Sequence, residues 1–161
     1  MNFNLAQINI ARMKAPLDSP VMAEFVAKLD TINALAENSE GFVWRLKDDS
    51  NNASSVRVYD DDFIIVNMSV WKDIASLFQF AYHSNHVEVF KKRRDWFEQM
   101  KEMHMALWYV PADSLPTVAD AIERLDFLRL NGETPFAFTF KSKFTIEDVV
   151  KFKVTDKQSI S

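Results

Sequence analysis

The stretch FIIVNMSVW, residues 63–71, is the clearest β-strand in the sequence. Successive side chains of a strand point to opposite faces, so this stretch has one wholly apolar face and one mixed face. The apolar face consists of Ile64, Val66, Met68 and Val70. The mixed face consists of Phe63, Ile65, Asn67, Ser69 and Trp71. We expect the apolar face to pack on helices and the mixed face to point away from them.

Two more predicted strands, at residues 4–13 and 42–46, divide in the same way. The first sets Ala6, Ile8 and Ile10 against Leu5, Gln7 and Asn9, and the second sets Phe42, Trp44 and Leu46 against Val43 and Arg45. Together the strands gather these polar side chains on one face: Gln7, Asn9, Arg45, Asn67 and Ser69. A face that is half polar and half aromatic is typical of a cavity that holds a small molecule or ordered water. The alternative is that these amides pair with each other or with the backbone of a partner subunit.

Capping residues and clusters of Pro, Gly and Asn place the other elements. The predicted order is a strand at 4–13, a helix from 20 to 36, strands at 42–46 and 63–71, a helical region from about 73 to 100 that is broken near 83–85, a strand at 103–110, a helix from 118 to 131 and a strand at 136–140. This order predicts an α+β fold, the ferredoxin-like split βαβ arrangement with a C-terminal helix–strand extension. We expect residues 1–140 to form one domain and residues 141–161 to form a tail or arm. Helices then cover one side of the sheet, so a homodimer is expected to cover the other.

The second helical region carries an unusual cation. Its apolar stripe consists of Val89, Phe90, Trp96, Phe97 and Met100. Arg93 lies in the middle of this stripe, His86 lies two turns before it, and Tyr82 lies one turn earlier still. A guanidinium on a buried stripe must be paired or must face a polar ligand. The functional interpretation is that Arg93 recognises an anion or carbonyl with His86 as acid or base, and the structural one is an ion pair and a hydrogen bond.

Composition narrows the classes of function. The 161 residues fit one domain, and the net charge of −4 argues against a nucleic-acid-binding protein. The sequence has no cysteine, which excludes disulfides and thiolate metal sites and suits a cytoplasmic location. The apolar runs are shorter than the roughly 20 residues of a membrane span, and the first residues lack the pattern of a secretion signal. The pair His83-x-x-His86 lacks a third ligand, and glycine-rich phosphate loops are missing, so neither a metal nor a cofactor is expected.

Several segments of the chain carry a resemblance to known proteins: Ala6–Ala11, Gly41–Leu46, Asn67–Trp71, Arg93–Phe97 and Leu107–Pro111. Together they resemble an uncharacterised bacterial family that is known only as a domain of unknown function, within the dimeric α/β-barrel superfamily. Three more segments look like the strand-to-helix region of antibiotic-biosynthesis-type monooxygenases: Ser69–Lys72, Leu77-Phe78 and Ser84–His86. The resemblance implies a dimeric α/β barrel, in which the sheets of two copies form the barrel. It implies no established activity.

Two hypotheses of function follow from the cavity and the resemblance. The first is a small dimeric enzyme, similar to a cofactor-free monooxygenase, that acts on an apolar or aromatic small molecule. His86 is its expected catalytic residue, and the expected substrate-binding residues are Asn9, Arg45, Asn67, Trp71, Tyr82, Arg93 and Trp108. The second is a non-catalytic ligand-binding or stress-associated protein that uses the same cavity.

A third hypothesis is haem binding through His86 or His83. The haem-degrading members of the superfamily use an Asn on the first strand, together with a Trp and a His around the second helix. Asn9 and His86 resemble two of these residues, whereas Phe80 falls near the position of the helical Trp. The missing Trp argues against a haem function.

Overall fold

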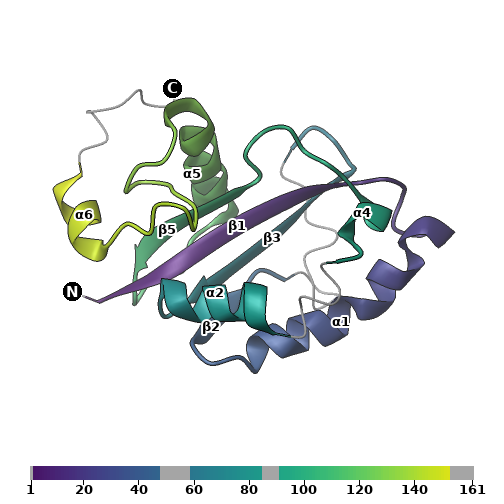
Figure 1. Cartoon of the computed structure of the whole chain (residues 1–161), viewed down its shortest axis with the longest axis horizontal. Coiled ribbons are helices and arrows are strands. Elements are labelled where there is room, and N and C mark those ends of the chain that lie inside the picture. Colours follow the sequence, from purple (N-terminus) through teal and green to yellow (C-terminus); the bar gives the residue numbers. More distant parts are fainter. Residues whose placement is uncertain (1, 48–58, 85–90, 153–161) are drawn as a thin grey trace.

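The computed structural model describes residues 2–47, 59–84 and 91–152. The elements are, in chain order, β1 (Phe3–Met13), the 3-10 helix η1 (Pro20–Met22), α1 (Ala23–Glu37), β2 (Phe42–Arg45), β3 (Ile64–Trp71), α2 (Ile74–His83), α4 (Arg93–Trp96), β4 (Phe97–Glu98), β5 (Met105–Pro111), α5 (Val118–Asn131) and α6 (Ile146–Lys151) (Figure 1). His86 lies outside the described residues.

The five strands form one antiparallel sheet in which β1 and β3 are central. β2 pairs with the outer edge of β3, and β5 and the short β4 pair with the other edge of β1. The longer strands therefore lie in the order β2-β3-β1-β5, with α1 between β1 and β2 and α2 after β3 in the chain. This is the split βαβ order, so the predicted α+β, ferredoxin-like fold is confirmed.

The helices cover different faces of the sheet from those we expected. The apolar face of β1, β3 and β5 packs on α5, and Ile8, Met68 and Trp108 are at most 1% exposed there. The mixed face points instead toward α1 and α2, which Figure 1 shows on the other side of the strands from α5. The expected assignment of faces is therefore wrong, because the C-terminal helix, rather than the two crossover helices, takes the most apolar face.

This arrangement also removes the reason given for a homodimer. A second copy was expected because one face of the sheet would lack cover, yet α5 buries that face within one chain through Ala121, Leu125 and Leu128. A homodimer stays a prediction, and among the described residues α5 covers the sheet face that a second copy was expected to bury.

A β-bulge in β2 decides which of its side chains reach the mixed face. Phe42 lies opposite Trp71, but Trp44 lies opposite Val70 because the register shifts between them. Such a bulge sets two residues of one strand against one of its partner, which moves the following side chain to the other face. The strand was predicted to keep Phe42 and Trp44 on one face, and that prediction is wrong. Arg45, opposite Ser69, is on the mixed face as expected.

Two other elements differ from the prediction. The helical region predicted over about 73–100 is broken after His83, as expected, but its second part does not reach Met100: the short α4 ends at Trp96 and the chain then forms β4, which pairs Phe97 with Met13. The strand predicted at 136–140 is reduced to isolated bridges, one of them between Phe138 and Leu107. Glu133 accepts hydrogen bonds from the backbone and the side chain of Thr139, and this closes the segment into a turn instead of an extended strand.

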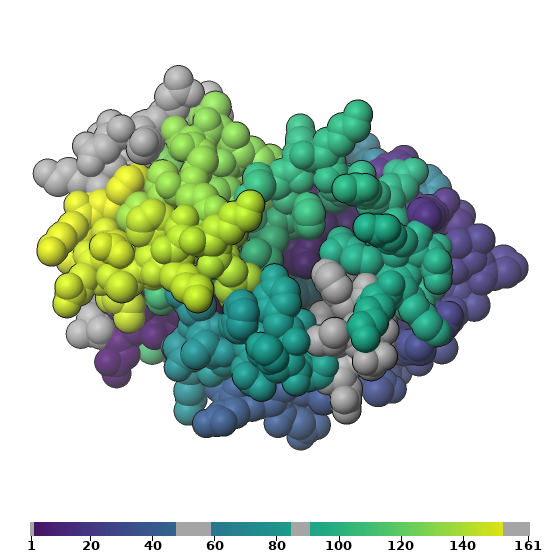
Figure 2. All heavy atoms as spheres, in the orientation of Figure 1, coloured from purple at the N-terminus to yellow at the C-terminus, as the bar shows by residue number. Residues whose placement is uncertain are grey.

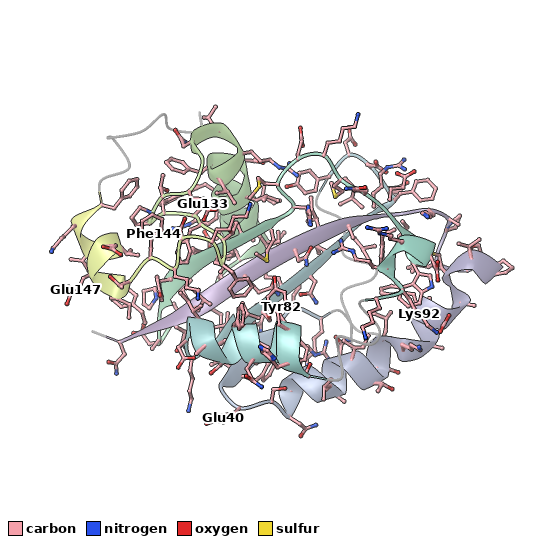
Figure 3. The ribbon with its side chains drawn as sticks, in the orientation of Figure 1. Glu40, Tyr82, Lys92, Glu133, Phe144 and Glu147 are labelled. Atoms are coloured by element: carbon pink, nitrogen blue, oxygen red, sulfur yellow. The ribbon has the colours of Figure 1, made fainter. Side chains whose placement is uncertain are left out.

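The segment after residue 140 packs on the body of the protein through Phe144. The Phe144 ring lies 5.6 Å from the Phe138 ring, and the Tyr109 hydroxyl donates to the Phe144 carbonyl over 2.8 Å. Figure 3 labels Phe144 beside α6, a short helix that is capped at Thr145 and has no buried residue. In the described part of the chain, no helix is long and apolar enough to cross a membrane.

Candidate functional site

A cavity of about 650 Å³ lies between the mixed face of the sheet and the helices α1 and α2. Figure 2 shows its opening as a hollow between the segment after α5, the segment before β5 and α2, with β1 in purple at the bottom. We call the part formed by the strands the floor; it consists of Gln7, Asn9, Ala11, Arg45, Ile65, Asn67, Ser69 and Trp71. The sequence alternation placed most of these side chains on one face, and the structure adds the helices that enclose them.

The floor contains a connected polar network. Gln7 donates through Nε2 to Asn67 Oδ1 over 2.6 Å and to Ser69 Oγ over 2.8 Å. The same Ser69 oxygen accepts a hydrogen bond from Trp71 Nε1 over 2.8 Å. The amides therefore pair with one another, as the structural alternative proposed, and they line a cavity as well.

Two amide side chains of the floor keep groups that a ligand can reach. Asn67 is exposed even though β3 lies between two other strands, because the cavity lies above it. Asn9, directly opposite Asn67 on β1, makes no side-chain hydrogen bond within the described residues. The Nδ2 donors of both residues stand outside the network, so they can bond to a polar group in the cavity.

Arg45 supplies a positive charge at the β2 side of the floor. It is 7% exposed, and its Nη2 lies 3.3 Å from Glu37 Oε1 on α1. A guanidinium is charged at all ordinary pH values and is oriented by its planar fork of donors. Arg45 therefore stands beside Ser69 as a fixed cation at the floor of the cavity.

Aromatic rings close both ends of the floor. At one end Trp71 stacks on Phe80 of α2, with ring centroids 5.2 Å apart. At the other end Phe25 of α1 contacts Trp96, with ring centroids 5.6 Å apart. Tyr82, labelled in Figure 3, lies at the opening with its ring centroid 5.7 Å from that of Phe140. The cavity is thus apolar at its ends and polar at its centre.

The structure brings most of the predicted substrate-binding residues to this cavity: Asn9, Arg45, Asn67, Trp71, Tyr82 and Arg93. It does not bring Trp108 there, because Trp108 points to the opposite face of the sheet and is buried beneath α5. The predicted catalytic residue, His86, lies outside the described residues.

Several lining residues were missed by sequence reasoning. Asn33 of α1 lines the cavity, and its signal was an amide among the apolar residues on the inner side of that helix. Lys101 and Lys141 also line it, and they come from segments between regular elements, where alternation gives no signal; Thr139 lines it too, from the segment that was predicted to be the last strand. Among the described residues, no group of three His, Asp or Glu side chains is placed to hold a metal ion.

Comparisons with known proteins give one family and several solved structures of similar fold. The family described as "Domain of unknown function (DUF3291)" matches residues 4–153. No curated protein matches the chain. The cofactor-independent oxygenase SnoaB from Streptomyces nogalater is 18% identical with a TM-score of 0.48, over 71% of this chain and 98% of that one. PA3566 from Pseudomonas aeruginosa is 12% identical with a TM-score of 0.46, over 71% and 98%. A dabb family protein with a ferredoxin-like fold from Mesorhizobium loti is 14% identical with a TM-score of 0.42, over 67% and 97%.

Proposed function

The chain belongs to the family described as "Domain of unknown function (DUF3291)", which brings no activity with it, so we propose a function from the cavity: the protein binds an aromatic or apolar small molecule there. The observation that carries this proposal is the size of the cavity, about 650 Å³, together with its aromatic ends and amide floor. Cavities that take small organic molecules have volumes of about 300–1,000 Å³ and this mixture of apolar walls and a few polar groups.

Spaces of this size are uncommon in the dense interior of a protein. Protein interiors are packed as densely as organic crystals, and a space that stays unfilled loses the dispersion contacts of every atom that lines it. The lining rings form two pairs, Trp71 with Phe80 at one end and Phe25 with Trp96 at the other. The sheet and helices hold the two pairs apart across the cavity, which favours a bound molecule between them.

Binding of a neutral aromatic probe tests the proposal. N-phenyl-1-naphthylamine has no charge, and its emission rises in an apolar site; Trp71 and Trp96 would report its entry through quenching of their own emission. Asn33→Trp should fill the cavity from α1 and weaken binding at least tenfold. Thr31→Trp, on the exposed side of the same helix, is the matched control and should bind as the wild type does. Equal binding by all three proteins, or by none, would contradict the proposal.

A more specific form of this proposal is catalysis, in which the protein oxygenates the bound molecule without a cofactor. Dioxygen is then the sole co-reactant: a CH₂ group between aromatic rings becomes a C=O group, and the second oxygen atom leaves as water with the two hydrogens. Asn9, Asn67 and Arg45 offer donors for the enolate oxygen that forms when the first proton leaves. His86, the expected proton acceptor, lies outside the described residues.

Oxygen consumption separates the catalytic form from plain binding. With anthrone as the probe, the wild type should consume one dioxygen for each molecule converted, and Asn67→Leu and His86→Ala should lower the rate while the probe still binds. Binding of the probe without any oxygen consumption would favour the alternative, a non-catalytic ligand-binding protein.

A further inference from the structure

The cavity extends along the strands. Its floor contains three rows of paired residues from β1 and β3: Gln7 with Ser69, Asn9 with Asn67, and Ala11 with Ile65. Each row takes up two residues of strand, so at a rise of about 3.3 Å per residue the three rows extend over about 20 Å. The helix above the floor has a similar length, because α1 lines the cavity from Phe25 to Ala36, which is about 17 Å at the helical rise of about 1.5 Å per residue.

The volume of the cavity makes this long space narrow. About 650 Å³ spread over a length of about 20 Å gives a mean cross-section on the order of 30 Å². This section is close to that of a single aromatic ring seen edge-on. An elongated molecule that is one ring wide therefore fills the cavity, whereas a compact fused ring system of the same size leaves part of its length empty.

The two ends of the cavity are built alike. At each end a half-buried phenylalanine lines the cavity and packs on a tryptophan that is at most 2% exposed. The two pairs are Phe80 with Trp71 and Phe25 with Trp96, with ring centroids 5.2 Å and 5.6 Å apart. Trp71 lies opposite Leu5, whereas the Trp96 carbonyl accepts from Lys14 N, so the pairs lie toward opposite ends of β1, as α2 and α4 do in Figure 1. Each buried tryptophan fixes the orientation of its phenylalanine, which can then stack against a ring of the ligand.

The polar rows of the floor lie nearer to the Phe80 end. Trp71 donates through Nε1 to Ser69 Oγ over 2.8 Å, which joins the first polar row directly to that end. The amide row of Asn9 and Asn67 follows. The row of Ala11 and Ile65 is apolar and separates the amides from the Phe25 end by about 7 Å of strand. A hydrogen-bonding group of the ligand therefore lies closer to Phe80 than to Phe25.

We infer that the ligand is an elongated molecule with two separate aromatic groups, joined by a linker whose hydrogen-bonding group lies next to one of them. One ring contacts Phe80, the polar group bonds to the amide floor, and an apolar part of the linker passes over Ala11 and Ile65 to place the second ring beside Phe25. This inference rests on the proposed function, since it names the class of molecule that the same cavity takes. It excludes fused ring systems as the preferred occupants.

A pair of compounds with equal size and different shape tests the inference. N-(4-Phenylbutyl)benzamide and 1-pyrenecarboxamide have the same number of non-hydrogen atoms, and each carries one neutral carboxamide. The first has two rings on an extended linker, whereas the second has a single fused system. Equilibrium dialysis should give a dissociation constant for N-(4-phenylbutyl)benzamide about tenfold or more below that for 1-pyrenecarboxamide, because only the elongated compound reaches both pairs of rings.

Variants assign each ring of the ligand to one end of the cavity. N-Butylbenzamide lacks the second ring, so it should bind at the Phe80 end alone. Phe25→Leu should then weaken binding of N-(4-phenylbutyl)benzamide about threefold or more and leave that of N-butylbenzamide unchanged, whereas Phe80→Leu should weaken both. Phe144→Leu, which changes a ring outside the cavity, is the matched control and should leave both constants unchanged. The comparison of the two shapes uses the wild type and does not depend on the folding of any variant.

The outcomes distinguish this inference from the proposed function. Tighter binding of the elongated compound, with a loss in Phe25→Leu that N-butylbenzamide does not share, supports both. Equal or tighter binding of 1-pyrenecarboxamide, or an equal effect of Phe25→Leu on the two benzamides, overturns the inference and leaves the proposed function standing. Failure of all three compounds and of N-phenyl-1-naphthylamine to bind overturns the proposed function itself.

Discussion

Ser69 joins the amide network of the floor to an aromatic ring at its end, because its hydroxyl oxygen accepts a hydrogen bond from each. It accepts from Gln7 Nε2 and from Trp71 Nε1, each over 2.8 Å, and it is buried. Ser69→Ala leaves both donors without this acceptor, which should lower the free energy of unfolding by about 1–3 kcal/mol. Urea denaturation measures the loss. Ser114→Ala, at an exposed loop position, is the control, and an equally small effect of both substitutions would contradict this role.

Two glycines offer a matched test of how β2 is held against α2. Both have a positive φ, 83° at Gly41 and 74° at Gly132, so alanine strains the backbone at either position by about 1–3 kcal/mol. A side chain at Gly41 would also overlap Ser76 Oγ, whereas nothing lies within 4 Å at Gly132. Gly41→Ala should therefore lower the melting temperature more than Gly132→Ala does. Adding Ser76→Gly should recover part of the difference; no recovery would show that the overlap is not its cause.

At the scale of elements, the sequence predicted the regular segments better than it predicted how they pack on one another. The alternation in residues 63–71 located β3 and its polar side chains correctly, because period two is a local property. Which face of the sheet α1 or α5 covers is not a local property. It depends on which helix packs best on the apolar face, and the sequence of β3 does not indicate which helix that is. Trp108 was misplaced for a second reason: its face follows from the register of β5 against β1, in which it lies opposite Ala6, and the sequence did not assign that register. The bulge in β2 could not be predicted either, because a register shift does not change the apolar pattern of the sequence.

The turn that replaces the expected last strand should depend on pH through Glu133, which is labelled in Figure 3. Burial raises the pKa of Glu133, but hydrogen bonds from the Thr139 backbone and from the Ser142 and Thr139 side chains outweigh it and leave this pKa below its ordinary value of 4.5. A carboxylate with a lowered pKa stabilises the fold above its ordinary pKa, and this contribution is lost as the pH falls through the lowered value.

Glu133→Gln should therefore destabilise the protein at pH 7, and its difference from the wild type should shrink below pH 4.5 as the carboxylate takes up a proton. Urea denaturation at both pH values measures that difference. Glu40→Gln, at an exposed position with no hydrogen bond within the described residues, is the control and should show no such change. A Glu133→Gln effect that is equal at both pH values would contradict the assigned hydrogen bonds.

At the scale of the whole molecule, the position of α5 affects which surface a second copy of the chain can bury. In a sheet with helices on one side, association would bury the bare face, and separated copies would expose it. Here Leu125 and Leu128 of α5 already cover that face, and Ile8 and Met68 beneath them are at most 1% exposed. In the described part of the chain, helices therefore cover both faces of the sheet, and the cavity is lined by elements of that same chain.

The homodimer that the family resemblance implies should then form through another surface and should separate without unfolding. Light scattering at micromolar concentration should give twice the chain mass of 18.7 kDa. On dilution to single chains, the circular dichroism and the binding of N-phenyl-1-naphthylamine should stay unchanged, because neither the core nor the cavity needs the partner. A mass of one chain at every concentration would reject the dimer. Loss of structure on dilution would show that the partner covers apolar surface that α5 does not.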